Sequence, residues 1–318
     1  MPDIRRHITR DVPVARVSDS PDAVIAALRG TRHHGVGTVF VVDGGEMLLG
    51  QVRLADIFAA AGTEGTLAQF VQAAPVTVHP DTDQEDAASL AIREDLISLP
   101  VVDDNGRFLG ALPPHALMQV LREEHVEDLH RLAGIWRSAE DARRALTQPP
   151  TLRLRHRLPW LLIGLAGSLL ATRVVAGFEA TLSQHVTLAF FIPLIVYLAD
   201  AVGTQTEAIA VRGLSLSPGG LGRLLLGEIG TGALIGLCLA LLAAGFERVV
   251  FGQPGLATVL GVSILAACTI ATTIGLLLPW AFSRVGWDPA LASGPIATVL
   301  QDVLSLLIYF FIAAAVLG

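Results

Sequence analysis

An aspartate stands inside a long apolar run near the end of this sequence. Asp302 lies in SGPIATVLQDVLSLLIYFFIAAAVLG, which begins at Ser293. A helix over residues 296–317 would cover about 33 Å at 1.5 Å per residue, which is enough to cross a bilayer. A carboxylate at the centre of a membrane helix costs about 2.5 to 3.5 kcal/mol on insertion scales, so it usually faces a polar pathway or a partner. Asp302 is therefore the first candidate for chemistry in this chain.

Charge and apolar content divide the chain into two halves. Residues 1–150 contain 22 acidic residues and 14 arginines, whereas residues 151–318 contain 7 and 8. The long apolar runs all lie in the second half, which predicts a membrane part preceded by a soluble domain with its own core. The first residues, MPDIRRHITRDVPVARV, have no apolar signal-peptide region. We therefore expect no cleavable signal and a cytoplasmic soluble half.

Length and charge predict five membrane spans in the second half. They are expected at about residues 158–177, 186–211, 221–246, 256–283 and 289–317. The arginines that border these spans gather on one side, at positions 153, 155, 157, 212, 223 and 284. The positive-inside rule then predicts a multi-pass protein of the cell (inner) membrane, with a cytoplasmic N-terminus and an exported C-terminus.

The soluble half contains an internal repeat. The segment TVFVVDGGEMLLGQV at 38–52 reappears as SLPVVDDNGRFLGAL at 98–112, with a constant offset of 60 residues. Each copy is typical of a strand, a glycine-bearing turn and a second strand, with a helix before and after. This part of the chain resembles a tandem CBS pair, a regulatory module that binds adenine nucleotides in some relatives and divalent cations in others.

The CBS resemblance implies a specific pattern for nucleotide binding. Nucleotide-binding members carry Ser or Thr and then Asp soon after the final glycine of the repeat, and that Asp binds the ribose. The first copy has Asp56 in this pattern, whereas the second has Pro113 and Ala116. Asp56 is therefore the one candidate ATP ligand, and the missing partners argue against a complete nucleotide site.

An acidic cluster lies between the repeat and the first membrane span. Glu124, Glu127 and Asp128 have the spacing of neighbours on one face of a helix. Hard divalent cations bind several oxygen ligands, so these carboxylates are candidate regulatory metal ligands. A solvated helix face is the alternative interpretation.

The membrane half resembles the MgtE family of magnesium channels. The segments that carry the resemblance are FE at 178–179, FFIPLIVYLADAVGTQTEAIAVRGLSL at 190–216, LLLGEIG at 224–230 and WDPALASGPIATVLQDVLSLLIYF at 287–310, with EEHVEDLHRLAG before them. The resemblance implies a homodimer in the lipid bilayer, with a pore built mainly from the second and fifth membrane helices. It also implies a cytoplasmic gate that closes at high internal Mg²⁺. We expect this chain to lack the acidic helical domain that precedes the CBS pair in many members.

The resemblance also assigns roles to residues of the fifth span. Asp302 falls on the pore carboxylate that holds a hydrated Mg²⁺ ion from both subunits, and Asp288 falls on an acidic position at the cytoplasmic mouth. Gly294 and Thr298 fall beside the ion, and Thr298 would contribute its carbonyl. Because Mg²⁺ dehydrates reluctantly, one carboxylate per subunit with backbone carbonyls suits it better than a closed protein cage.

Other acidic residues of the membrane half leave alternatives open. Asp200 stands one residue away from a family amide, and it either joins the ion pathway or pairs with a neighbour such as Arg212. Glu179 is expected at the exported entrance. Glu207 and Glu228 are either helix-packing or interfacial groups, and Glu228 matches a family acid of structural role.

The predicted fold is an α-helical transmembrane bundle of five helices with an N-terminal cytoplasmic α/β tandem CBS domain. The expected divisions are a CBS domain at 1–120, an acidic connecting, plug-like helix and linker at 121–156, and the pore domain at 157–318. The predicted function is a divalent-cation channel, for Mg²⁺ above all, gated by internal cation. The alternatives are a H⁺- or Na⁺-coupled transporter of Mg²⁺, Co²⁺, Mn²⁺ or Ni²⁺, and a non-conducting CBS sensor. No nucleophile constellation, P-loop or metallohydrolase motif predicts an enzyme, and no nucleic-acid partner is expected.

Overall fold

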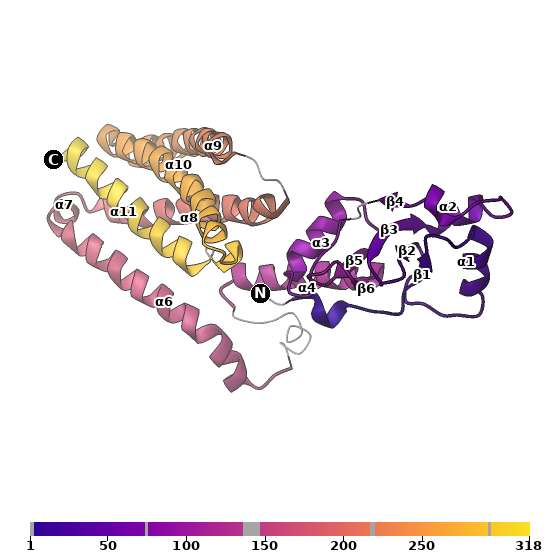
Figure 1. The fold of residues 1–318 in the computed structure, drawn as a ribbon. Helices are drawn as coiled ribbons and strands as arrows, with labels where there is room; N and C mark the ends of the chain where they lie inside the picture. Colours follow the sequence, from indigo (N-terminus) through magenta and orange to yellow (C-terminus); the bar gives the residue numbers. More distant parts are fainter. Residues whose placement is uncertain (1–2, 74–75, 136–146, 217–219, 292–293) are drawn as a thin grey trace. The chain divides into compact units, whose positions relative to one another are not determined.

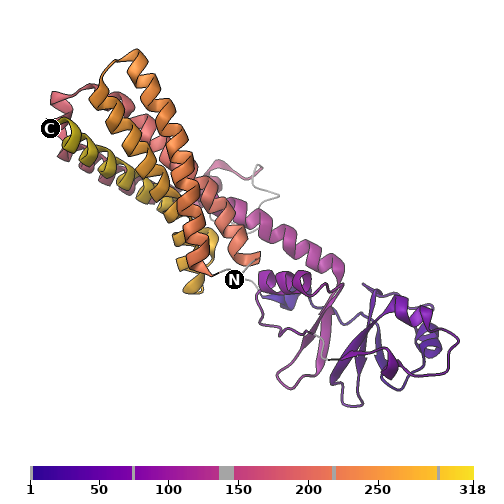
Figure 2. The ribbon, with the colours of Figure 1, turned by 90° about the horizontal axis from the view of Figure 1, so that it is seen from above.

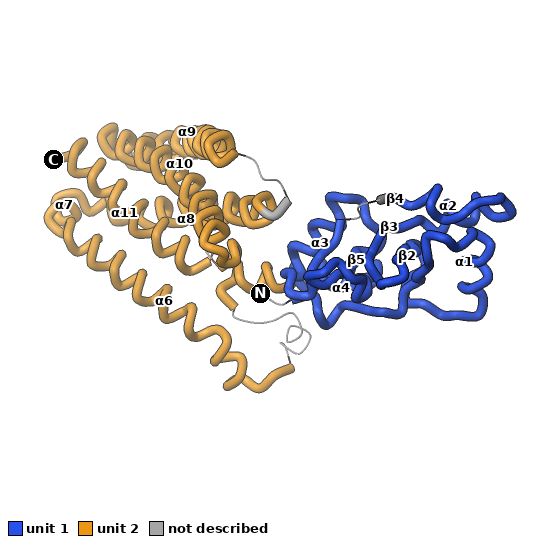
Figure 3. The backbone as a smooth tube through the Cα atoms, in the orientation of Figure 1, with its two compact units in different colours: residues 1–125 blue, residues 126–318 orange. Residues whose placement is uncertain are grey.

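The computed structural model describes residues 3–73, 76–135, 147–216, 220–291 and 294–318 (Figure 1). The chain divides into two compact units, residues 1–125 and residues 126–318 (Figure 3). The boundary between the two units lies within helix α4 (Pro114–Leu132). Within the predicted linker at 121–156, residues 136–146 lie outside the described residues.

The first unit is built from two copies of an α/β repeat. The elements of the first copy are β1 (Val14–Arg16), α1 (Pro21–Leu28), β2 (Thr38–Val42), β3 (Leu48–Arg53), α2 (Leu54–Ala59) and β4 (Gln72–Ala73), with the short 3₁₀ helix η2 (Leu67–Gln69). The short 3₁₀ helix η1 (Ile4–His7) packs on the core of the second copy, which contains Ile4. Its strands form one sheet in the order β1-β2-β3-β4, with β1 parallel to β2 and the other pairs antiparallel. The second copy comprises α3 (Gln84–Arg93), the antiparallel pair β5 (Leu99–Val102) and β6 (Phe108–Leu112), and α4. The predicted α/β pair is confirmed.

The two hairpins repeat the same turn. In each, the aspartate after the first strand accepts hydrogen bonds from two backbone N–H groups. The partners are Gly45 (2.8 Å) and Met47 (2.9 Å) for Asp43, and Asn105 (2.9 Å) and Arg107 (2.8 Å) for Asp103. The backbone hydrogen bond from Arg107 is the main cause that lowers the pKa of Asp103. Each hairpin also has a bulge at the matching position, so the repeat read from the sequence is present in the backbone.

The last glycine of each repeat stands where another part of the backbone passes close by. A Cβ atom at Gly50 would lie 2.6 Å from the carbonyl oxygen of Gln72. At Gly110, whose φ is +148°, a Cβ atom would lie 2.5 Å from the carbonyl oxygen of Thr9. Only glycine leaves room for these approaches.

Gly110→Ala should destabilise the first unit by about 2 to 3 kcal/mol, because the new methyl group meets backbone atoms and the φ angle disfavours a side chain. Thermal unfolding of the full chain in detergent measures the effect. Gly44→Ala is the matched control, since a Cβ atom there has no other atom within 4 Å. Equal melting temperatures for the two variants would contradict the account of Gly110.

In its described residues, the second unit contains five helices that are long and apolar enough to cross a membrane. They are α6 (Pro150–Gly177), α8 (Thr187–Leu216), α9 (Leu221–Val250), α10 (Pro254–Arg284) and α11 (Pro295–Leu317), with α7 (Glu179–Gln184) between the first two and η3 (Pro289–Leu291) before the last. The predicted five-helix bundle is confirmed. The start of the fifth span was predicted too early, because Gly294 has a φ of +74° and α11 begins only after it.

Helix α10 is the most extensively packed helix of this bundle, and it lies beside α11 (Figure 1 and Figure 2). Helix α10 packs against α8, α9 and α11, and α11 also packs against α6 and α8. Small residues allow the close crossing of α8 and α10, because a Cβ atom at Gly275 would lie 2.9 Å from the carbonyl oxygen of Gly203. The hydroxyl of Tyr309 on α11 donates to the carbonyl of Leu188 on α8 at 2.9 Å. These contacts hold α8 beside both α10 and α11.

Candidate cation-binding site

Helix α11 carries three of the predicted site residues on one face. Gly294, Thr298 and Asp302 follow each other at four-residue intervals, which places them on the same side of a helix. Gly294 is the N-cap, and its carbonyl accepts the N–H of Thr298 at 3.0 Å. Asp302 is half-buried in the single chain. The structure therefore brings these three residues together, and ion binding by them stays a prediction.

Asp200 of α8 is an electrostatic neighbour of Asp302. Its charge acts on Asp302 across the α8–α11 packing. The Asp200 Oδ1 atom is buried and has no hydrogen-bond partner among the described residues. Arg212 cannot be its partner within one chain, because α8 is continuous between them and 12 helical residues rise about 18 Å. Arg212 instead pairs with Asp128 at 3.2 Å.

Two further residues of this region, Glu207 and Gln301, contact each other. The Gln301 Nε2 group donates to Glu207 Oε1 at 2.7 Å, and both side chains are at most 3% exposed. Glu207 also forms a hydrogen bond with the backbone of Gly294. The sequence allowed two interpretations of Glu207, a helix-packing or an interfacial group, and Gln301 was not among the predicted site residues. A usable signal was present, because Gln301 is a second polar residue in the apolar run, directly before Asp302.

Glu228 of α9 has a set of partners that suits a structural role. The Thr206 hydroxyl donates to Glu228 Oε2 at 3.2 Å, and the Thr272 hydroxyl donates to the Glu228 carbonyl at 3.0 Å. These bonds join α9 to α8 and α10. They favour the helix-packing interpretation of Glu228.

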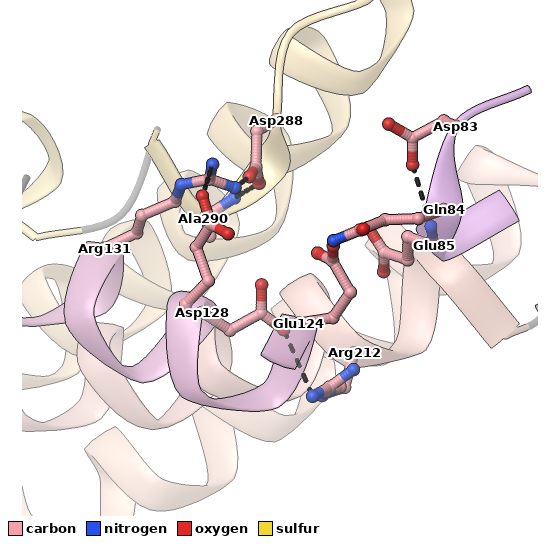
Figure 4. A network of polar contacts seen from close by, with 10 residues as sticks. Asp83, Gln84, Glu85, Glu124, Asp128, Arg131, Arg212, Asp288 and Ala290 are labelled. Atoms are coloured by element: carbon pink, nitrogen blue, oxygen red, sulfur yellow. Dashed lines mark hydrogen bonds and ion pairs between the residues drawn. The ribbon is translucent and has the colours of Figure 1, made fainter. Parts of the chain in front are cut away.

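Asp288 lies in the connection between α10 and α11 and is 7% exposed. Its Oδ1 atom accepts the N–H of Ala290 at 2.7 Å, which caps η3, and its Oδ2 atom pairs with Arg131 of α4. Arg131 also pairs with Glu127, one turn earlier on α4. Figure 4 shows Arg131 reaching Asp288. A role of Asp288 at the mouth of a pore stays a prediction.

The predicted acidic cluster of α4 is not a solvated face. Glu124 and Asp128 are each 6% exposed. In the first unit, Glu124 accepts a hydrogen bond from Gln84; in the second, Asp128 pairs with Arg212 (Figure 4). The solvated-face alternative is therefore wrong for these two residues, because protein groups already bind their carboxylates. Their role as regulatory cation ligands stays a prediction.

The remaining predicted site residues lie at the surface. Glu179 is exposed at the start of α7, and Asp56 is exposed in the first turn of α2. Asp56 does not line the small cleft of the first unit that Gln51 and Glu94 border. Nucleotide contact by Asp56 and ion attraction by Glu179 stay predictions.

Within the described residues, no group of three or more His, Cys, Asp or Glu side chains is arranged to hold a metal ion. Mg²⁺ usually keeps several waters and needs only one or two direct carboxylate ligands. The binding of a largely hydrated ion by Asp302 and Asp200 therefore stays a prediction.

Arg131→Gln should lower the free energy of unfolding by about 3 kcal/mol, because it leaves the buried carboxylate of Asp288 without its cation. Thermal unfolding in detergent measures the loss, and the double variant with Asp288→Asn should recover much of it. The exposed Arg5–Asp81 pair supplies the control, since Arg5→Gln should have almost no effect. Equal losses for Arg131→Gln and Arg5→Gln would refute the buried pair.

Comparisons with known proteins agree with these two units. Residues 192–312 match the family model MgtE, described as a divalent cation transporter, and residues 3–62 and 67–123 match the CBS domain model. The magnesium transporter MgtE of Thermus thermophilus is 34% identical over 88% of this chain and 62% of its own length. That of Enterococcus faecalis is 33% identical over 87% of this chain and 60% of its own length.

Among solved structures, the cytosolic domain of the Mg²⁺ channel MgtE in complex with ATP is 29% identical, covers 36% of this chain and 46% of that chain, and has a TM-score of 0.34. This chain spans about three fifths of the length of the two curated relatives. Its CBS pair followed by a membrane domain that matches the MgtE model makes the chain similar to these magnesium transporters over most of its own length.

Proposed function

We propose that this chain transports Mg²⁺ across a membrane, with Asp302 as the ligand of the hydrated ion. The observation that carries the proposal is the Asp302 carboxylate of α11, on which the charge of Asp200 of α8 acts, inside helices that match the divalent cation transporter model. Carboxylates inside membrane helices mark ion pathways, because burial in lipid without a partner is costly. The similar proteins of Thermus thermophilus and Enterococcus faecalis are named magnesium transporters.

The proposed pathway is an ion channel at the interface of a homodimer. One chain supplies one Asp302, and two copies bring two carboxylates to the same hydrated ion. The Thr298 carbonyl and the Gly294 position on the same face of α11 contact the water shell, and Asp200 adds negative charge that attracts cations. Asp288 and Glu179 stand at the two mouths, with the N-terminus in the cytoplasm.

The proposed gate is the end of α4. Within the second unit, a Cβ atom at Gly134 would lie 3.1 Å from Pro295, and one at Gly294 would lie 3.0 Å from the carbonyl oxygen of Leu132. The residues that end α4 thus contact the start of α11, the helix that carries Asp302. Internal cations that bind the α4 carboxylates close the channel, provided that they have higher affinity for the closed form.

Asp302→Asn should reduce Mg²⁺ uptake into proteoliposomes at least about tenfold, because it keeps the size of the side chain but loses the charge that holds the dication. Asp302→Glu should retain part of the flux. Melting temperatures of the same samples separate a pore ligand from a structural group. If Asp302 had only a structural role, Asp302→Asn would still conduct Mg²⁺ and Asp302→Ala would have a lower melting temperature. Wild-type Mg²⁺ flux in Asp302→Asn would contradict the assignment of Asp302 as the pore ligand. Flux that collapses without a proton or sodium gradient would instead identify a coupled transporter.

Neutralising the α4 carboxylates should leave conduction intact and weaken inhibition by internal Mg²⁺. The variant combines Glu124→Gln, Glu127→Gln and Asp128→Asn, and its inhibition curve is compared with wild type in inside-out patches. Arg212→Gln is the matched control, because it breaks the contact of Asp128 but keeps all three carboxylates. Unchanged inhibition in the triple variant, or an equal loss in Arg212→Gln, would remove these residues from the cation sensor.

A further inference from the structure

Glu207 is a buried acid whose partners are neutral. It is 3% exposed within α8, and its hydrogen bonds come from the Gln301 amide and the Gly294 backbone. In the part of the chain that the structure describes, no ion pair includes Glu207. A carboxylate with no cationic partner in an apolar bundle is costly.

The surroundings of Glu207 contain more acceptors than donors. Gln301 is 2% exposed, and its Oε1 atom is buried without a hydrogen-bond partner among the described residues. Asp200 Oδ1 is likewise buried without a hydrogen-bond partner among the described residues, and the charge of Asp200 acts on Glu207. Buried acceptors normally have partners, so this region calls for a cation or a further donor.

Gly203 shows where the free amide oxygen lies. A Cβ atom at Gly203 would overlap both Oε1 and Nε2 of Gln301, so the amide rests directly on the α8 backbone at that glycine. Gly203 follows Asp200 by three residues and precedes Glu207 by four, which places all three on one face of α8. The Gln301 oxygen therefore lies on the strip between the two carboxylates.

We propose that Glu207, the Gln301 amide oxygen and Asp200 form a second binding position for a divalent cation within a single chain. Two carboxylates and an amide oxygen are hard ligands, and Mg²⁺ that keeps several waters needs no larger set. The position adjoins the proposed pore site, because Gln301 and Asp302 are consecutive residues of α11. Neighbouring positions let an ion bind strongly enough to enter and still leave, since a second ion repels the first. The inference rests on the proposed function only for the identity of the cation.

The test counts bound Mn²⁺, a paramagnetic probe with the same ligand preference, on the purified full-length chain by electron paramagnetic resonance. Glu207→Gln should remove about one competable Mn²⁺ per chain, since a neutral amide replaces the carboxylate that anchors the ion. The variant keeps the side-chain length and an acceptor for Gln301 Nε2. Added Mg²⁺ should displace this Mn²⁺ from the wild-type chain.

Two further variants make the count decisive. Gln301→Met keeps an unbranched side chain but removes the amide oxygen, so it should weaken Mn²⁺ binding at this position while Glu207 remains. Glu228→Gln is the matched control, because that carboxylate already accepts a hydrogen bond from Thr206, and its Mn²⁺ count should equal that of wild type. Melting temperatures without divalent cations identify any variant that loses its fold.

The outcomes separate this inference from the proposed function. The same Mn²⁺ count and affinity in wild type and Glu207→Gln would overturn the second position, even if Asp302→Asn abolishes Mg²⁺ flux. Such a result would indicate that Glu207 is neutralised by a proton instead. A lower count in Glu207→Gln, with an unchanged count in Glu228→Gln, supports the inference whether or not Asp302 proves essential for flux.

Discussion

The membrane unit is organised by the cost of placing carboxylates among apolar helices. Asp200 and Glu207 lie on α8 and Asp302 lies on α11, two helices that pack together, and the charge of Asp200 acts on both other acids. None of the three can be solvated by the bundle's apolar core, so each must face a polar partner, an ion or water. The glycine at position 203 permits this arrangement, because it lets the Gln301 amide reach the α8 backbone between two of the acids.

The position of α11 depends in turn on its first residues. Gly294 adopts a positive φ and leaves space for the carbonyl of Leu132, so the helix can begin directly beside the end of α4. The Arg131–Asp288 pair joins α4 to the connection just before α11. A displacement of the last turn of α4 would therefore act first on the start of the helix that carries Asp302. This continuity gives the proposed gate a physical basis within one compact unit.

Local patterns in the sequence predicted the parts of the fold that depend on local chemistry. The 60-residue offset predicted the paired hairpins, and apolar length predicted the five membrane helices. Asp302 stood out because a charge in an apolar run is visible without knowledge of the fold. The Glu207–Gln301 and Arg131–Asp288 contacts could not be predicted in the same way, since their partners lie 94 and 157 positions apart and only packing brings them together. The solvated-face interpretation of Glu124 and Asp128 failed for the same reason, because helical spacing alone does not show what covers a face.

The consecutive residues Gln301 and Asp302 show how one helix can serve two environments. Successive side chains of an α-helix point about 100° apart, because a turn takes 3.6 residues. Gln301 accordingly lies on the buried face of α11 with Ala297 and Ser305, whereas Asp302 lies with Thr298 on a neighbouring, half-buried face. In the proposed homodimer, the Gln301 oxygen therefore faces the interior of one chain, whereas the carboxylate of the next residue, Asp302, lies on the face available to both chains. An ion would then pass between a position built within a chain and a position shared by two chains without any change in the helix itself.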